Sequence, residues 1–240
     1  MNETRWERWG AASGYAALLA GAAAVVFERG PVSASDPTGE IAAYFADNRG
    51  ALRAQGLLFV IGAGFFLWFL GSLRSFLVRA EGGTGRLSAV AFGAGIASIV
   101  ITVVALAFQI GLAMAPGGAV EPALVATMGA VFTVANLPLA VMLIAVAVVS
   151  FRTRAFPAWL GWLSVAAAAA QLAPSFGMIL DSGPLAADGW LAAYVPYPLY
   201  VVWLAAATTA MIRRIGRPAQ TVVVPDTPEE LIDWTRRRGN

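Results

Sequence analysis

Residues Leu87–Met114 read LSAVAFGAGIASIVITVVALAFQIGLAM, an apolar run of 28 residues without a charged side chain. About 20 apolar residues are enough for a helix to cross the roughly 30 Å hydrocarbon core of a bilayer. This run exceeds that minimum, so a helix formed by it would tilt or project beyond the bilayer. The stretch therefore predicts a membrane-spanning helix.

Five other apolar runs lie on either side of this one, and together they predict six membrane spans. We expect these spans over about residues 9–27, 54–76, 87–114, 123–151, 157–180 and 190–212. The chain is 59% hydrophobic and only 12% charged, whereas a soluble domain has roughly 25% charged residues. The expected fold class is all-α: a polytopic transmembrane helical bundle over residues 1–212, followed by a cytoplasmic tail over residues 213–240.

The distribution of arginine predicts the orientation, because loops on the cytoplasmic side of a membrane carry an excess of positive charge. With the N-terminus inside, 13 of the 16 arginines fall on the inner side, namely Arg5, Arg8, Arg74, Arg79, Arg86, Arg152, Arg154, Arg213, Arg214, Arg217, Arg236, Arg237 and Arg238. We therefore expect both termini in the cytoplasm. The bias toward Ala, Gly and Arg, with no Lys, is typical of a GC-rich bacterial genome, so the expected location is a bacterial inner membrane.

The first apolar run has a second interpretation, a cleaved signal peptide. Arg5 and Arg8 would form its basic region, and Val32-Ser33-Ala34 a weak cleavage site. The run is longer than the apolar core of a usual signal peptide, so we prefer a retained helix.

The longest outer segment contains a predicted amphipathic helix over about residues 37–49. Asp36 is placed to cap it, with Pro37 at the first helical position and Gly50 at its end. Ile41, Tyr44 and Phe45 would then share one face. Such a helix rests on the bilayer or on the mouth of the bundle. The alternative is a lid over an outward-facing cavity.

The tail contains a second short amphipathic helix, predicted over about residues 228–238. Thr227-Pro228-Glu229-Glu230 is a capping box, and three arginines near the end of the helix suit its dipole. Leu231, Ile232 and Trp234 would hold it on the inner leaflet, where anionic lipid attracts the arginines. Docking to a cytosolic partner is the alternative.

Residue types that are missing from the chain exclude several functions. Without Cys there is no disulfide, thiolate or iron–sulfur chemistry. Without His the usual haem ligand, most catalytic zinc sites and the usual general base are lost. Without Lys no Schiff base forms. We expect no enzymatic activity, no cofactor and no nucleic-acid partner. An outer carboxylate site for a metal, built from Glu28, Asp181 and Asp188, is the remaining enzymatic hypothesis.

Neutral polar side chains inside the predicted spans suggest a binding pocket. The candidates fall between mid-membrane and the outer surface, where Arg53 and Gln55 also enter the second span; they are Gln109, Asn136, Gln171, Tyr194 and Tyr197. Prolines nearby would kink the surrounding helices. The alternative is a purely structural role, in which the amides form ordinary interhelical hydrogen bonds and the tyrosines form an aromatic belt.

Small residues at helical spacing predict close helix packing. Gly10 and Gly14 open the first span, and Ser13, Ala17 and Gly21 continue a small-residue stripe along it. Such stripes are common inside helical bundles.

Two short motifs carry a resemblance to a known kind of protein. Arg154-Ala155-Phe156-Pro157-Ala158-Trp159-Leu160-Gly161-Trp162-Leu163 and Glu40-Ile41-Ala42-Ala43-Tyr44 resemble segments of bacterial six-helix membrane proteins known by a domain-of-unknown-function label. The resemblance extends loosely over all six spans. It implies a six-helix fold and no particular activity.

Two functions stay open at this level. The first is a non-enzymatic accessory or interaction protein that binds a membrane-protein partner within the lipid bilayer. The alternative is a small-molecule binding or transport protein whose outward-facing pocket is lined by the five polar candidates.

Overall fold

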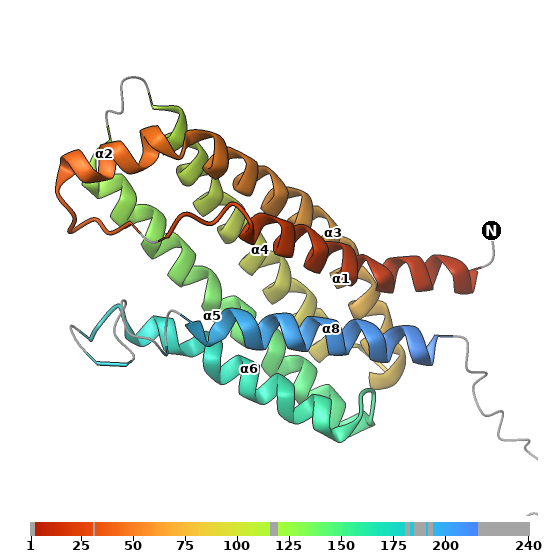
Figure 1. The fold of residues 1–240 in the computed structure, drawn as a ribbon. Coiled ribbons are helices and arrows are strands. Elements are labelled where there is room, and N and C mark those ends of the chain that lie inside the picture. The colour runs from red at the N-terminus through yellow and green to blue at the C-terminus, as the bar shows by residue number, and fades with distance from the viewer. Residues whose placement is uncertain are drawn as a thin grey trace, which may run out of the picture.

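The computed structural model describes residues 3–30, 32–115, 120–180, 183–184, 191 and 194–215. This part of the chain forms seven helices joined by turns, with no strand among them (Figure 1). The helices are α1 (Glu3–Val25), α2 (Thr38–Asp47), α3 (Arg49–Glu81), α4 (Arg86–Met114), α5 (Pro122–Thr153), α6 (Ala158–Phe176) and α8 (Pro196–Arg214). The expectation of an all-α bundle is confirmed.

Three of the helices, α3, α4 and α5, are long and apolar enough to cross a membrane. They contain 33, 29 and 32 residues. Helices α1, α6 and α8 overlap three further predicted spans and contain 23, 19 and 19 residues. Polar residues and prolines lower their mean hydropathy, as Gln171 and Pro174 do in α6. The bundle is compatible with a membrane protein.

Six of the helices form a closed ring. Helix α1 packs against α3, α3 against α4, α4 against α5, α5 against α6, α6 against α8, and α8 against α1. Successive helices of the ring run in opposite directions (Figure 1). Because their number is even, α1 begins and α8 ends at the same end of the ring, here called the arginine end. The opposite end is covered by α2 and is called the α2 end.

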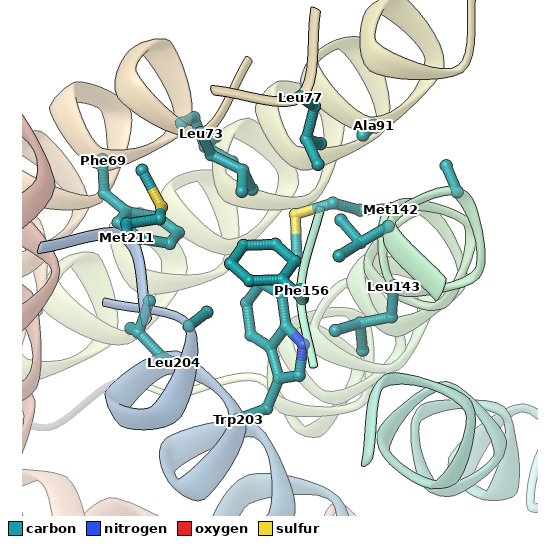
Figure 2. Packing of buried hydrophobic residues seen from close by; sticks show 14 of the residues in the cluster. Phe69, Leu73, Leu77, Ala91, Met142, Leu143, Phe156, Trp203, Leu204 and Met211 are labelled. Carbon is teal, nitrogen blue, oxygen red and sulfur yellow. The ribbon is translucent and has the colours of Figure 1, made fainter. Parts of the chain in front are cut away.

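The core of the ring lies toward the arginine end. Phe69, Met142, Phe156, Trp203 and Met211 are at most 1% exposed and interlock between α3, α5 and α8 (Figure 2). This half of the ring is therefore a filled core.

Close approach of α1 to its neighbours depends on its glycines. A Cβ atom on Gly14 would lie 2.1 Å from Thr208 Oγ1 and 2.9 Å from Phe69 Cδ2, and one on Gly10 would lie 2.2 Å from Ser72 Oγ. A Cβ at Gly10 could be accommodated by rotation of the Ser72 hydroxyl, whereas one at Gly14 would also meet the Phe69 ring and force α1 away from its neighbours. The small-residue stripe predicted for the first span thus lies at a helix–helix contact.

Polar contacts fix the turns at the arginine end. Glu81 accepts hydrogen bonds from the N–H groups of Leu87 and Ser88 and from the Ser88 hydroxyl, and so caps the start of α4. Arg214 donates to the carbonyl oxygens of Arg154 and Ala155. These contacts join α3 to α4 and α8 to the α5–α6 turn.

Helix α2 lies across the opposite end of the ring. Its buried residues, Ile41 and Phe45, pack with Leu52, Leu112 and Val125 of the ring helices. The expected apolar face is therefore present, and it rests on the end of the bundle.

The predicted cap and end of this helix were wrong. Asp36 accepts a hydrogen bond from the Ser33 N–H, so it closes the preceding turn, and Pro37 takes the N-cap position without a side-chain cap. Asn48 is the C-cap of α2, where the backbone leaves the helical conformation, and its side-chain amide donates to the Tyr44 carbonyl. Gly50 lies inside α3. The helix predicted over residues 228–238 and the start of the sixth run, at Trp190, lie outside the described residues.

Candidate functional site

The half of the ring toward the α2 end contains a cavity of about 620 Å³, here called the central cavity. All seven helices contribute to its wall. Glu28 and Gly30, in the segment that follows α1, also line it. Glu28 is exposed, so the cavity reaches the surface at this point.

Four of the five polar residues singled out in the sequence line the central cavity: Gln109, Asn136, Gln171 and Tyr197. The fifth, Tyr194, is not among the lining residues, and its side chain is 72% exposed. Helix α8 begins only at Pro196, so the helical spacing that relates Tyr197 to Tyr200 does not extend back to Tyr194. Their role in binding stays a prediction.

A chain of three polar side chains enters the cavity from its opening. The Glu28 carboxylate accepts a hydrogen bond of 2.7 Å from Gln55 Nε2. The Gln55 carbonyl oxygen in turn accepts one of 2.7 Å from Gln109 Nε2. Gln55 is only 4% exposed and Gln109 is half-buried, so the Glu28 carboxylate is joined through a buried amide to a second amide inside the bundle. We name this set the Glu28–Gln55–Gln109 chain.

The other two amides bind backbone carbonyl groups. Gln171 is 2% exposed, and its Nε2 donates to the Pro196 carbonyl at 3.0 Å. Asn136 Nδ2 donates to the carbonyl oxygens of Phe132 and Thr133, both at 3.2 Å. Each amide therefore keeps its NH₂ group on the protein, and its orientation is fixed.

Tyr44 of α2 connects this helix to the segment at the opening. Its hydroxyl donates to the Gly30 carbonyl at 3.0 Å. Burial, and next the nearby Glu28 carboxylate, raise the pKa of Tyr44 above its usual value. The phenol therefore stays protonated and keeps donating.

Sequence reasoning included Gln109 in the candidate set but left out its two partners. Gln55 carried a usable signal, since it is an amide at the same predicted depth of an apolar helix. Nothing in the sequence indicated that Glu28 lines a cavity, because it lies in a polar segment with other acidic residues. Their contacts join residues 27 and 54 positions apart, which a single sequence does not reveal.

The described residues contain no group of three or more acidic side chains that would hold a metal ion. Asp181 and Asp188, two members of the carboxylate site considered from the sequence, lie outside the described residues. That hypothesis therefore gains no support here.

Comparison of the chain with protein-family models, with curated proteins and with solved structures gave no match.

Proposed function

We propose that all six ring helices cross a bacterial inner membrane with the arginine end in the cytoplasm. The ring arrangement supports this, because α1, α6 and α8 each pack between two other ring helices. The outer surface of the ring carries exposed apolar side chains such as Leu57, Trp68 and Ile144. Patches of this kind mark a surface that contacts lipid or protein.

The absence of cysteine makes the topology directly testable. Single cysteines introduced at Thr84, in the α3–α4 turn, and at Glu121, at the start of α5, lie at opposite ends of the ring. A membrane-impermeant maleimide applied to intact cells should label Glu121→Cys and leave Thr84→Cys unlabelled until the cells are opened. The reverse labelling would invert the proposed orientation.

We further propose that the protein binds a small molecule in the central cavity and either senses it or transports it. The observation that carries this proposal is the meeting of the Glu28–Gln55–Gln109 chain with Asn136 and Gln171 around one cavity. Ligand sites typically measure about 300–1,000 Å³ and combine apolar walls with a few placed polar groups. An accessory protein held together by packing alone has no need of such a space, since interiors are normally filled.

An accessory or interaction role remains the alternative. The exposed apolar side chains do not favour it, because lipid contact alone accounts for them. Partner binding would instead have to be shown by co-purification in mild detergent.

The binding proposal is tested by thermal unfolding of the purified protein against a library of small molecules. A ligand at a hundred times its Kd stabilises the folded state by about 2.7 kcal/mol. The midpoint should rise in the wild type but not in Asn136→Leu, which replaces a lining amide by a bulkier apolar group. Val134→Leu is the matched control, since Val134 is two residues away on α5 and 45% exposed. A ligand that shifts the wild type and both variants equally would place binding elsewhere.

A further inference from the structure

We propose that the ligand of the central cavity is a hydrophobic organic cation, with an ammonium group attached to an apolar body. Resting on the proposed binding function, this inference names the chemical class that the cavity would select. Three features of the wall support it: its charge, the direction of its amides and its aromatic rings.

The charge of the wall is negative. Among the described lining residues, Glu28 is the one acidic or basic side chain. Arg29 follows it, but its guanidinium donates to the carbonyl oxygens of Val26 and Glu28 and is not part of the wall. The ion pair found in the described part of the chain, Arg79 with Glu7, lies at the arginine end. The Glu28 carboxylate therefore has no cation of the described residues within ion-pair distance.

The amide oxygens of three lining residues have no donor in the described part of the chain. Backbone carbonyls and a carboxylate accept hydrogen bonds and cannot donate, so the amide groups that face them must be NH₂ groups. Gln55, Asn136 and Gln171 each face such an acceptor, so their NH₂ groups are the donors. The remaining Gln55 oxygen is the acceptor for Gln109, so the NH₂ group of Gln109 donates to it. None of the described residues donates to the carbonyl oxygens of Gln109, Asn136 or Gln171. These oxygens remain free to accept from a ligand N–H or to face a positive charge.

The hydrogen-bond donors of the wall are neutral groups. The hydroxyl groups of Tyr44, Ser98 and Thr102 already donate to backbone carbonyls. Those of Tyr197 and Tyr200 have no partner among the described residues, and the NH₂ groups of Gln55, Gln109 and Gln171 each keep a second N–H besides the one that they donate. All these donors are neutral, so an anionic ligand would face the Glu28 carboxylate with no cation of the described lining to offset it, and the wall selects against it.

Aromatic rings contribute to the apolar part of the wall. Phe59, Phe66, Phe132, Tyr197 and Tyr200 are all among the lining residues. The negative face of an aromatic ring attracts ammonium groups, and recognition of quaternary ammonium ligands relies on such rings. The same rings provide apolar contact for the body of the ligand. A single ligand with a cationic head and an apolar body thus suits the charge, the unpaired amide oxygens and the rings of the wall.

Three probes that share one body test this inference on the full-length protein in a non-ionic detergent. They are phenylethyl-trimethylammonium, its uncharged analogue with a tert-butyl group in place of the trimethylammonium group, and phenylethyl sulfonate. Dissociation constants are measured by calorimetric titration. The cation should bind at least about tenfold more tightly than the neutral analogue, and the sulfonate should not bind measurably.

Glu28→Gln is the decisive variant, because its amide oxygen still accepts the hydrogen bond from Gln55 while the charge is lost. It should weaken binding of the cation about tenfold and leave the neutral analogue unchanged. Glu40→Gln is the matched control: Glu40 lies on α2, is exposed and does not line the cavity. Equal binding of the neutral or anionic probe would overturn the cation assignment but leave a binding cavity in place. Failure of all three probes would overturn the cation assignment, whereas the proposed binding function falls only if the library of small molecules also produces no shift that depends on Asn136.

Discussion

The hydrogen bond between Trp203 and Ser164 allows a sharp test of how the core of the ring is held together. Both residues are fully buried, and Trp203 Nε1 donates to Ser164 Oγ at 2.8 Å. The Ser164 hydroxyl donates in turn to the Leu160 carbonyl. The two ends of this bond are not equivalent. Ser164→Ala leaves a buried indole N–H without an acceptor, whereas Trp203→Phe leaves a serine that still has its own partner.

The magnitudes follow from this asymmetry. An orphaned buried donor costs about 1–3 kcal/mol, so Ser164→Ala should lower the free energy of unfolding within that range. Trp203→Phe should cost about 1–2 kcal/mol, through lost packing volume. Because Trp203→Phe removes the indole donor, adding Ser164→Ala to it should change the free energy of unfolding very little. The double variant should therefore be more stable than the sum of the two single effects predicts. Side-chain hydrogen bonds in membrane bundles couple by about 0.6 kcal/mol on average and 1.7 kcal/mol at most, and we expect about 1 kcal/mol for this buried pair.

The assay is reversible unfolding from non-ionic micelles by titration with a denaturing detergent, followed by far-ultraviolet circular dichroism. Ser75→Ala is the matched control, because the exposed Ser75 hydroxyl donates only to the Gly71 carbonyl of its own helix. Its effect should add to that of Trp203→Phe. Strict additivity of Ser164→Ala with Trp203→Phe would refute the account, since the indole N–H would then not depend on Ser164.

Two further predictions concern the arginine end and the α1 contact. Gly14→Ala should lower the free energy of unfolding by about 1–3 kcal/mol, because its Cβ would overlap Thr208 and overpacking of this kind costs that much. Gly64→Ala, which meets no atom within 4 Å, should be neutral or stabilising in the same unfolding titration. Hydrogen bonds from the Ser88 hydroxyl and then from backbone N–H groups hold the pKa of Glu81 below its ordinary 4.5. The pKa of Glu81 is lower in the folded than in the unfolded state, so the ionised carboxylate stabilises the fold. This contribution is complete above pH 4.5 and is lost as the pH falls through the folded-state pKa. Glu81→Gln should thus lower the unfolding midpoint at neutral pH, and the difference between its midpoint and that of the wild type should shrink in acid. A difference that does not change with pH would show that the charge of Glu81 is not involved.

The helices of the ring were predictable because each depends on local composition. An apolar run of span length is sufficient evidence for a helix in this kind of chain, and the observed helix α4, Arg86–Met114, begins one residue before the predicted span 87–114. The ends of helices were less predictable, since they depend on single hydrogen bonds. Asp36 has the right residue type for a cap, yet the Ser33 N–H competes for its carboxylate. The sequence contains no measure of which donor is closer.

The central cavity was predictable in part. Depth along an apolar run places Gln109, Asn136 and Gln171 at one level, and that information is local. Whether they face one another depends on the rotation and the order of the helices in the ring, which apolar composition does not determine. Glu28 was therefore missed as a lining residue, and Tyr194 was included although the prolines at the start of α8 separate it from that helix.

The filled and hollow halves of the ring differ in the polarity of the residues that face inward. Toward the arginine end these are large and apolar, as Figure 2 shows for Phe156 and Trp203. Toward the α2 end the wall also includes the polar side chains of Gln55, Gln109 and Asn136. An apolar void of this size would be strongly destabilising. Buried amides change that balance, because a cavity with several polar partners holds water at little cost. The Glu28–Gln55–Gln109 chain thus joins helices and also provides polar partners for water in this space.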